Sequence, residues 1–267
     1  MTGILDKIFA DKAEELEAAK RKTPLKDLKD KIQSQREVKN ILPVLRKDGS
    51  SRIIAEIKRR TPFLDDLRKD FDPVEIAGVY EDNGAAAISV LTESRYFGGH
   101  LDFLKQIHVG VPLLRKDFLF DEYQVYESRA WGADFFLLIA TQLEKNHIAD
   151  LMGLGKELHL TALVETHTEW DMEKAIEADA ALVGINNRDL QTGKTDLNIA
   201  RRLVKMGNQI PDIIMVCESG INSRREIEEF EALGIHAFLI GGSLMKSDNI
   251  PEKLKDLLGY GKTQAAG

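Results

Sequence analysis

Six short apolar runs in this chain each stop at a residue that is polar or unusually small. They cover residues 53–58, 112–116, 162–165, 182–186, 214–218 and 238–242, and they end at Lys58, Lys116, Glu165, Asn186, Glu218 and Gly242. In a (β/α)8 barrel, or TIM barrel, the catalytic side chains lie at the C-terminal ends of several parallel strands. The repetition therefore predicts an α/β barrel whose functional groups gather at one mouth.

Strand-like and helix-like segments alternate after about residue 50, and eight pairs can be counted. The strands are expected at 52–58, 86–91, 111–116, 134–139, 160–165, 181–186, 212–217 and 236–240. The helices are expected at 73–83, 100–108, 121–131, 143–158, 168–178, 196–206, 222–232 and 249–258. Short, largely apolar runs are typical of parallel strands buried on both faces, between a barrel interior and a helix layer.

Composition agrees with one domain over residues 1–267. The length is close to the roughly 250 residues of one complete barrel, and no linker divides the chain. The net charge of −7 disfavours general nucleic-acid binding, and no apolar stretch approaches the roughly 18 residues of a membrane span. The single cysteine, Cys217, excludes an intrachain disulfide and fits a reducing compartment. We expect a cytoplasmic protein, and a monomer, although the sequence leaves an oligomer open.

Residues 1–50 precede the first strand and form a helical extension in this interpretation. Apolar residues from Ile4 to Ala19 lie near one face of a charged helix, and Leu25, Leu28 and Ile32 continue a second stripe. Two helices packed on the barrel are expected. They are either a solvated amphipathic cap over apolar surface or a lid over the mouth. Residues 259–267 have no periodicity and are expected to form a loose tail.

Charged side chains dominate the predicted strand ends. Glu56 and Lys58 lie two residues apart and so point to the same side of a strand, while Lys116, Glu165 and Glu218 end three other strands. Long charged groups inside a barrel must pair to offset desolvation. Mutually neutralising ion pairs alone would have no reason to gather at one mouth, so the set indicates a site with general acids and bases.

Two glycine-containing loops follow the last two strands. Ser219 and Gly220 follow Glu218, and Gly241 and Gly242 follow the eighth strand. Glycines in these places either make tight turns or let backbone N–H groups approach an anion. Barrels often bind phosphate at these two loops, which favours the second interpretation. Lys58 is then an additional cation for the same phosphate.

The strand-end motifs resemble those of the indole-3-glycerol phosphate synthase family. The resemblance covers nearly the whole chain, and six motifs occur in order. They are Ile54-Ala55-Glu56-Ile57-Lys58-Arg59-Arg60-Thr61-Pro62, Ser89-Val90-Leu91-Thr92-Glu93 with Tyr96-Phe97-Gly98-Gly99, Leu114-Arg115-Lys116-Asp117-Phe118, Leu163-Val164-Glu165-Thr166-His167, Gly184-Ile185-Asn186-Asn187-Arg188-Asp189-Leu190 and Glu218-Ser219-Gly220-Ile221.

The resemblance implies a reaction and a role for each polar residue. The family closes the ring of 1-(2-carboxyphenylamino)-1-deoxyribulose 5-phosphate to indole-3-glycerol phosphate, with loss of carbon dioxide and water, in tryptophan biosynthesis. Lys116 is then the acid that protonates the ribulose carbonyl, and Glu165, with Lys58 as acid partner, serves the dehydration. Glu56 would hold Lys116 charged. The further roles implied are substrate positioning by Asn186 and Glu218 and contact with the anthranilate carboxylate by Arg188.

An apolar wall and the absence of a cofactor complete the expectation. Phe97, Phe118 and Leu137 match the family's wall for the aromatic ring, with ordinary core packing as the alternative. Loss of carbon dioxide restores aromaticity, so no electron-sink cofactor or metal is needed. The six histidines have no metal-ligand spacing. The expected partner is one small phosphosugar substrate, without nucleic acid or membrane.

The chain departs from the family after Thr61 and Pro62. The family usually continues with a small polar residue and a glycine, whereas this chain has Phe63-Leu64-Asp65-Asp66-Leu67. Aspartates there would repel a doubly anionic substrate, and loss of the glycine would alter a closing motion. A barrel that binds ligand with little turnover is therefore the alternative hypothesis. A phosphosugar isomerase is disfavoured, since such enzymes typically use an Asp or Cys pair.

Overall fold

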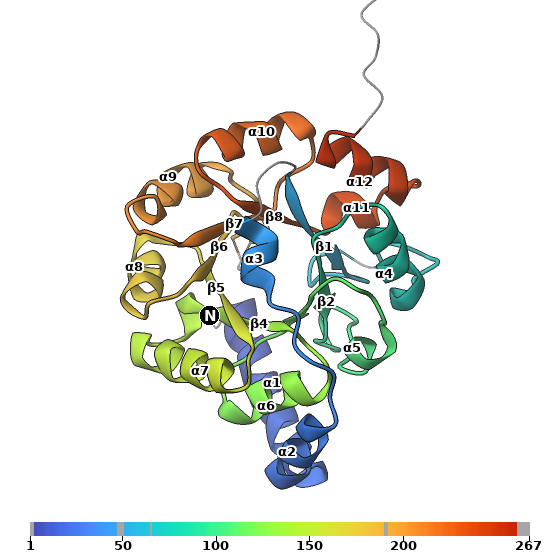
Figure 1. The fold of residues 1–267 in the computed structure, drawn as a ribbon, viewed down its shortest axis with the longest axis vertical. Helices are drawn as coiled ribbons and strands as arrows, with labels where there is room; N and C mark the ends of the chain where they lie inside the picture. Colours follow the sequence, from blue (N-terminus) through green and yellow to red (C-terminus); the bar gives the residue numbers. More distant parts are fainter. Residues whose placement is uncertain (1–2, 47–50, 65, 190–191, 261–267) are drawn as a thin grey trace, which may run out of the picture.

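Eight parallel strands close into a barrel in chain order, as the strand and helix alternation predicts. The computed structural model describes residues 3–46, 51–64, 66–189 and 192–260. Figure 1 looks along the barrel, with the strands inside a ring of helices. The strands are β1 (Arg52–Ile57), β2 (Ala87–Leu91), β3 (Leu113–Lys116), β4 (Phe135–Ile139), β5 (Thr161–Thr166), β6 (Leu182–Asn186), β7 (Ile214–Glu218) and β8 (Ala237–Ile240). Each begins within two residues of its predicted start.

The outer helices follow the strands at the expected places. They are α4 (Pro73–Asp82), α5 (Phe103–Gln106), α6 (Glu122–Ala130), α7 (Lys145–Glu157), α8 (Glu169–Glu177), α9 (Asn198–Gly207), α10 (Arg224–Ala232) and α12 (Ile250–Leu258). Local sequence explains their starts. The Asp72 carboxylate accepts the N–H groups of Val74 (2.8 Å) and Glu75 (3.1 Å), and Pro73 occupies the first helical position.

Three short elements were not predicted: α3 (Ile41–Arg46), the 3₁₀ helix η1 (Ala140–Gln142) and α11 (Gly242–Met245). The extension therefore holds three helices rather than two, α1 (Ile4–Lys22), α2 (Leu25–Gln33) and α3. Elements of three to six residues show too little periodicity to be distinguished from loops. The glycine-containing loop expected after β8 is short, because α11 already begins at Gly242.

Alternation along the strands separates two apolar clusters. On β1, Ile53, Ala55 and Ile57 join the cluster between strands and helices, while Ile54 belongs to the cluster inside the barrel. Glu56 has the same parity as Ile54, so it points inward at the C-terminal end. The barrel wall thus fixes which side chains reach the mouth.

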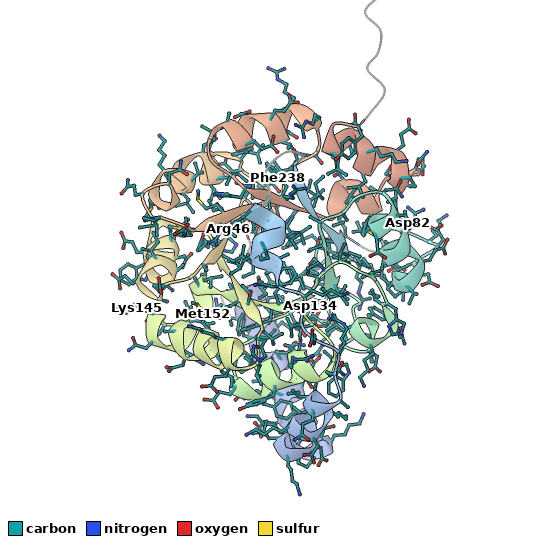
Figure 2. The ribbon with its side chains drawn as sticks, viewed as in Figure 1. Arg46, Asp82, Asp134, Lys145, Met152 and Phe238 are labelled. Carbon is teal, nitrogen blue, oxygen red and sulfur yellow. The ribbon has the colours of Figure 1, made fainter. Side chains whose placement is uncertain are left out.

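The extension covers both ends of the barrel. Ile41 and Leu45 of α3 belong to the interior cluster, and Arg46 Nη2 donates to the Asp212 carbonyl (2.5 Å), just before β7. Figure 1 shows α3 across the near end, where Figure 2 labels Arg46. Leu5 and Ile8 of α1 join the same cluster from the C-terminal end, while α2 packs on α6.

The last described helix, α12, ends two residues before the end of the described chain. Gly259 ends α12 in the left-handed region, and Tyr260 is exposed. The remainder of the expected tail, residues 261–267, lies outside the described residues. In the part of the chain that the structure describes, every helix is too short or too polar to cross a membrane.

Candidate active site

A pocket of about 510 Å³ opens at the C-terminal ends of the strands. It is lined by every residue that the sequence predicts for the site. These residues are Glu56, Lys58, Phe97, Lys116, Phe118, Leu137, Glu165, Asn186, Arg188, Glu218, Ser219, Gly220, Gly241 and Gly242. They come from all eight strands or the loops that follow them, so barrel closure brings together residues that are up to 186 positions apart in the sequence.

Lys116 lies at the centre of the charged groups. Its Nζ is 3.0 Å from Glu165 Oε2 and 3.5 Å from Glu218 Oε2. Burial alone would lower the pKa of Lys116, but the carboxylates of Glu165, Glu218 and Glu56 outweigh burial and raise it. Lys116 is therefore a fixed ammonium group, directed into the pocket from the end of β3.

Glu56 has a different direct partner from the one expected. Its carboxylate accepts a hydrogen bond from Lys58, the residue two positions along the chain, rather than from Lys116. Its negative charge still acts on Lys116 at longer range and raises the pKa of that group. Burial opposes ionisation of Glu56, yet Lys58 and Lys116 together lower its pKa. Lys58 therefore pairs directly with Glu56, and Lys116 pairs directly with Glu165, within one charged network.

Glu165 and Glu218 differ sharply although both are buried. Burial favours protonation of Glu165, but Lys116 and then His167 lower the pKa of Glu165 to about 2. For Glu218 burial dominates, and together with Glu165 and Glu56 it outweighs Lys116 and raises the pKa to about 8. The pKa values of these two buried acids are therefore displaced in opposite directions.

Two glycines make room for these carboxylates. A Cβ atom on Gly184 of β6 would lie 2.1 Å from Glu218 Oε1, and one on Gly241 would lie 2.2 Å from Glu56 Oε2. Real Cβ contacts are never this short, so any larger residue would displace the acid. Neither spatial role was recognisable from the sequence, because each depends on a strand or loop far away in the chain.

The predicted phosphate loops present backbone to the pocket. Ser219 and Gly220 have positive φ values of 62° and 89°, which turn the chain sharply after β7. Asn187 Nδ2 fixes this turn by donating to the carbonyl groups of Glu218 (2.9 Å) and Ser219 (3.1 Å). Gly242 has nothing within 4 Å of its Cβ position, so the loop after β8 leaves open space beside its backbone.

Aromatic rings form the apolar side of the pocket. The Phe97 and Phe118 ring centroids are 6.0 Å apart, and Phe9 of α1 packs edge-on against Phe118 at 5.5 Å. Glu93 holds the loop that carries Phe97, since its Oε2 accepts the N–H groups of Tyr96 (2.7 Å) and Phe97 (2.9 Å). Phe97 is partly exposed, whereas Phe118 and Leu137 are buried.

Asn186 and Arg188 are joined at the end of β6. Asn186 Oδ1 accepts the N–H group of Arg188 (3.0 Å), and a hydrogen bond from Asn186 helps to lower the pKa of Glu165 after the contributions of Lys116 and His167. Arg188 Nη1 donates to the Gly193 carbonyl (2.6 Å). The guanidinium group therefore has an anchor within its own loop while it lines the pocket.

A family model described as indole-3-glycerol phosphate synthase matches residues 5–257. The chain belongs to the indole-3-glycerol phosphate synthase family. Curated relatives with that name include one from Desulfosudis oleivorans, 46% identical over 97% of this chain and 99% of the relative. Another, from Dehalococcoides mccartyi, is 43% identical over 96% of this chain and the whole relative. A relative from Legionella pneumophila is 41% identical over 97% of this chain and 99% of its own.

Solved structures show the same fold at greater distance. A crystal structure of 3-hexulose-6-phosphate synthase aligns with a TM-score of 0.63 over 79% of this chain and 99% of that one. Sequence identity is 16%, so the similarity concerns the barrel alone.

The loop that departs from the indole-3-glycerol phosphate synthase pattern has an ordered turn. Thr61 N–H donates to the Leu64 carbonyl (3.0 Å), and Phe63 lines the pocket. The Asp66 carboxylate pairs with Arg59 (3.3 Å), so its charge is partly offset. The other aspartate of the expected repulsion, Asp65, lies outside the described residues.

Sequence reasoning missed three parts of the site: the apolar side chains of α1, the lysine Lys12 and the histidine His167. Ile4, Leu5 and Ile8 line the pocket, although the sequence did not show which end of the barrel α1 covers. Lys12 of α1 forms a buried ion pair with Asp117 (3.0 Å), which directly follows Lys116. His167 lies beside Glu165. The last two could have been suspected, because an isolated lysine on an apolar face and a histidine after a strand both need partners.

Metal ligation finds little support among these side chains. Within the described residues, no group of three or more His, Cys, Asp or Glu side chains is arranged to hold a metal ion. Cys217 is buried, and burial raises the pKa of its thiol to about 12. Asn187 Nδ2 lies 3.2 Å from its sulfur. The site therefore offers acids, bases, fixed charges and an apolar wall.

Proposed function

We propose that this chain catalyses the indole-3-glycerol phosphate synthase reaction, the decarboxylating and dehydrating ring closure of 1-(2-carboxyphenylamino)-1-deoxyribulose 5-phosphate. The observation that carries the proposal is the Lys116 ammonium, held among buried carboxylates in a pocket with one apolar wall, in a chain of this family. Ring closure needs an acid at the carbonyl and a place for the aromatic ring. Both lie in the same pocket.

The acid and base roles divide between Lys116 and Glu165. Lys116 protonates the ribulose carbonyl while the aromatic carbon attacks it, and the remaining carboxylates stabilise its ammonium form. Loss of carbon dioxide then restores aromaticity without an electron sink. Glu165, whose lowered pKa keeps it ionised, takes a proton in the dehydration, and Lys58 supplies one to the departing hydroxyl. Glu56 holds Lys58 in place for this step.

The remaining pocket residues position the substrate. The loops at Ser219 and Gly220 and at Gly241 and Gly242 receive the phosphate through backbone N–H groups. Arg188 faces the anthranilate carboxylate. Asn186 and Glu218 orient the ribulose hydroxyl groups. The aromatic ring is held by Phe97, Phe118 and Leu137.

The protein's setting follows from the same proposal. The chain acts on one small phosphosugar in tryptophan biosynthesis, as a carbon-carbon lyase in the cytoplasm, and its site is complete within one monomer. No nucleic acid or membrane takes part. The single barrel domain spans residues 1–267, with residues 1–50 as its extension.

The test is turnover of the purified, metal-free protein on 1-(2-carboxyphenylamino)-1-deoxyribulose 5-phosphate, followed by indole fluorescence. The wild type should produce indole-3-glycerol phosphate. Lys116→Ala should abolish ring closure and leave phosphate affinity within about tenfold, since the phosphate loops are separate from β3. Normal turnover by Lys116→Ala would refute the assignment of the acid. Tight substrate binding without turnover in the wild type would refute the proposed activity itself.

A further inference from the structure

His167 lies directly behind Glu165, outside the residues that line the pocket. The two oxygens of Glu165 face different partners: Oε2 is 3.0 Å from Lys116 Nζ, and Oε1 is 3.5 Å from His167 Nε2. The His167 side chain is 12% exposed, and its Nε2 atom is buried without a hydrogen bond to any described residue. An unpaired imidazole nitrogen therefore faces the carboxylate that acts as base.

The neighbours of His167 determine which of its nitrogens carries the hydrogen. Thr141 Oγ1 donates its only hydrogen to Asp171 Oδ2 (2.9 Å). Towards His167 Nδ1, 3.3 Å away, the hydroxyl group can then only accept. Nδ1 therefore carries a hydrogen in both charge states of the ring. Nε2, which faces Glu165, has a lone pair in the neutral ring and is the nitrogen that gains a proton.

Asp171 keeps this arrangement in one orientation. Its side chain is buried, and Oδ2 also accepts the backbone N–H groups of His167 (3.2 Å) and Thr168 (3.1 Å) at the start of α8. Lys174 Nζ lies 3.5 Å from Oδ1. Because the Asp171 carboxylate is fixed and can only accept, the Thr141 hydroxyl group donates its hydrogen to Asp171. Asp171 thereby orients the imidazole through Thr141.

We propose that His167 is the positioning residue that stores the proton taken up by Glu165 during the dehydration, by receiving it at Nε2. This inference rests on the proposed function. The transfer moves one proton and no other atom. The carboxyl O–H bond breaks, its electron pair stays on Glu165, and an N–H bond forms at Nε2. The reverse step returns the proton to Glu165, which releases it to solvent in the pocket, and Lys58 regains from solvent the proton it gave to the departing hydroxyl.

Charge explains why a second proton holder is useful. Burial favours the protonated acid, but the Lys116 ammonium overrides burial and lowers the pKa of Glu165, so Glu165 alone holds a proton poorly. The imidazole nitrogen 3.5 Å from Glu165 Oε1 gives the proton a second place beside the carboxylate. The titratable groups around the ring are Glu165 from β5, Asp171 and Lys174 from α8, and Lys116 from β3 beyond Glu165. The adjoining η1 contributes only the uncharged Thr141.

The experiment compares His167→Gln with Thr141→Val, using His147→Gln on the exposed side of α7 as the control. The readouts are kcat, KM and the pH dependence of kcat between pH 5 and 9. His167→Gln should lower kcat by about 10- to 100-fold with KM within about threefold, and should remove the acidic limb of the profile. Thr141→Val should move that limb to lower pH, because the acceptor that stabilises the imidazolium is lost. His147→Gln should match the wild type.

Two results would overturn the proposal. One is an unchanged kcat and pH profile in His167→Gln. The other is an equal loss at every pH in both variants, which would indicate a structural role only. If His167→Gln does not fold, Thr141→Val alone decides, since a limb that stays in place contradicts the proton-storing role. A wild type without turnover would instead refute the proposed function, so the two failures are distinguishable.

Discussion

Two buried carboxylates at opposite ends of the barrel have opposite surroundings. Asp134, just before β4 and labelled in Figure 2, has four donors. Its Oδ1 accepts Arg36 Nη1 and the Lys39 N–H, both at 2.7 Å, and its Oδ2 accepts Arg36 Nη2 (2.7 Å) and the Leu113 N–H (2.9 Å). Glu218, at the end of β7, has an Oε1 without a hydrogen bond to any described residue.

The difference indicates what each end of the barrel contributes. A buried charge with all its hydrogen bonds fixes structure, and here Asp134 ties the segment between α2 and α3 to β3 and β4. A buried acid beside other acids is costly for folding and is typical of a functional site. The N-terminal end, closed by α3, therefore stabilises the fold, whereas the C-terminal mouth keeps groups whose pKa values are displaced.

Removing the satisfied carboxylate should give the largest stability change. Asp134→Ala leaves the Leu113 and Lys39 N–H groups without their acceptor, so the free energy of unfolding should fall by about 3 to 5 kcal/mol. Urea unfolding measures this change. At a temperature where the variant is folded, its kcat should stay within about threefold of the wild type. A folded variant with a tenfold lower kcat would contradict the division between the two ends.

Two of the ion pairs that dock α1 give a finer comparison. Lys12 and Asp117 are 8% and 2% exposed, while Lys20 and Asp121, 2.9 Å apart, are 35% and 31% exposed. Lys12→Met should cost about 3 kcal/mol, because Asp117 loses one of its two buried cationic partners. Lys20→Met on the same helix should cost less than about 1 kcal/mol. Equal costs in urea unfolding would show that burial does not separate these pairs.

A third effect should depend on pH. Folding raises the pKa of Glu218 from an ordinary 4.5 to about 8, so its contribution to stability is complete at low pH and is lost as the pH rises through 8. Glu218→Gln has no such loss. Relative to the wild type, its free energy of unfolding should therefore rise as the pH is raised from 5 to 9.

The matched control for this pH effect is Asp134→Ala, whose cost should stay nearly constant over the same range. If the difference in unfolding free energy between Glu218→Gln and the wild type did not change with pH, folding would not raise the pKa of Glu218. Both variants can be compared in the same series of urea titrations.

Much of the mouth could be predicted because barrel geometry is simple. Strand parity directs Glu56 inward, and parallel strands bring Lys116, Glu165 and Glu218 to one end. The pairing inside the cluster could not be predicted, since it depends on the reach of individual side chains, as the bond between Lys58 and Glu56 illustrates.

The position of α3 and the need for glycine at position 184 also could not be predicted from the sequence. Helix α3 has six residues and only one buried stripe, so its place across the N-terminal end follows from tertiary contacts alone. The need for glycine at 184 arises from Glu218 on the neighbouring strand. In both cases the physical cause lies far away in the chain.

The most direct test of this division is the turnover number of Glu165→Gln, measured beside that of Asp134→Ala at a temperature where both are folded. Glu165→Gln keeps the size of the side chain but cannot accept the proton, so kcat should fall by about 100-fold or more with folding intact. Asp134→Ala should keep nearly full turnover. If Glu165→Gln turned over normally while Asp134→Ala lost activity, the assignment of chemistry to the mouth and stability to the opposite end would be wrong.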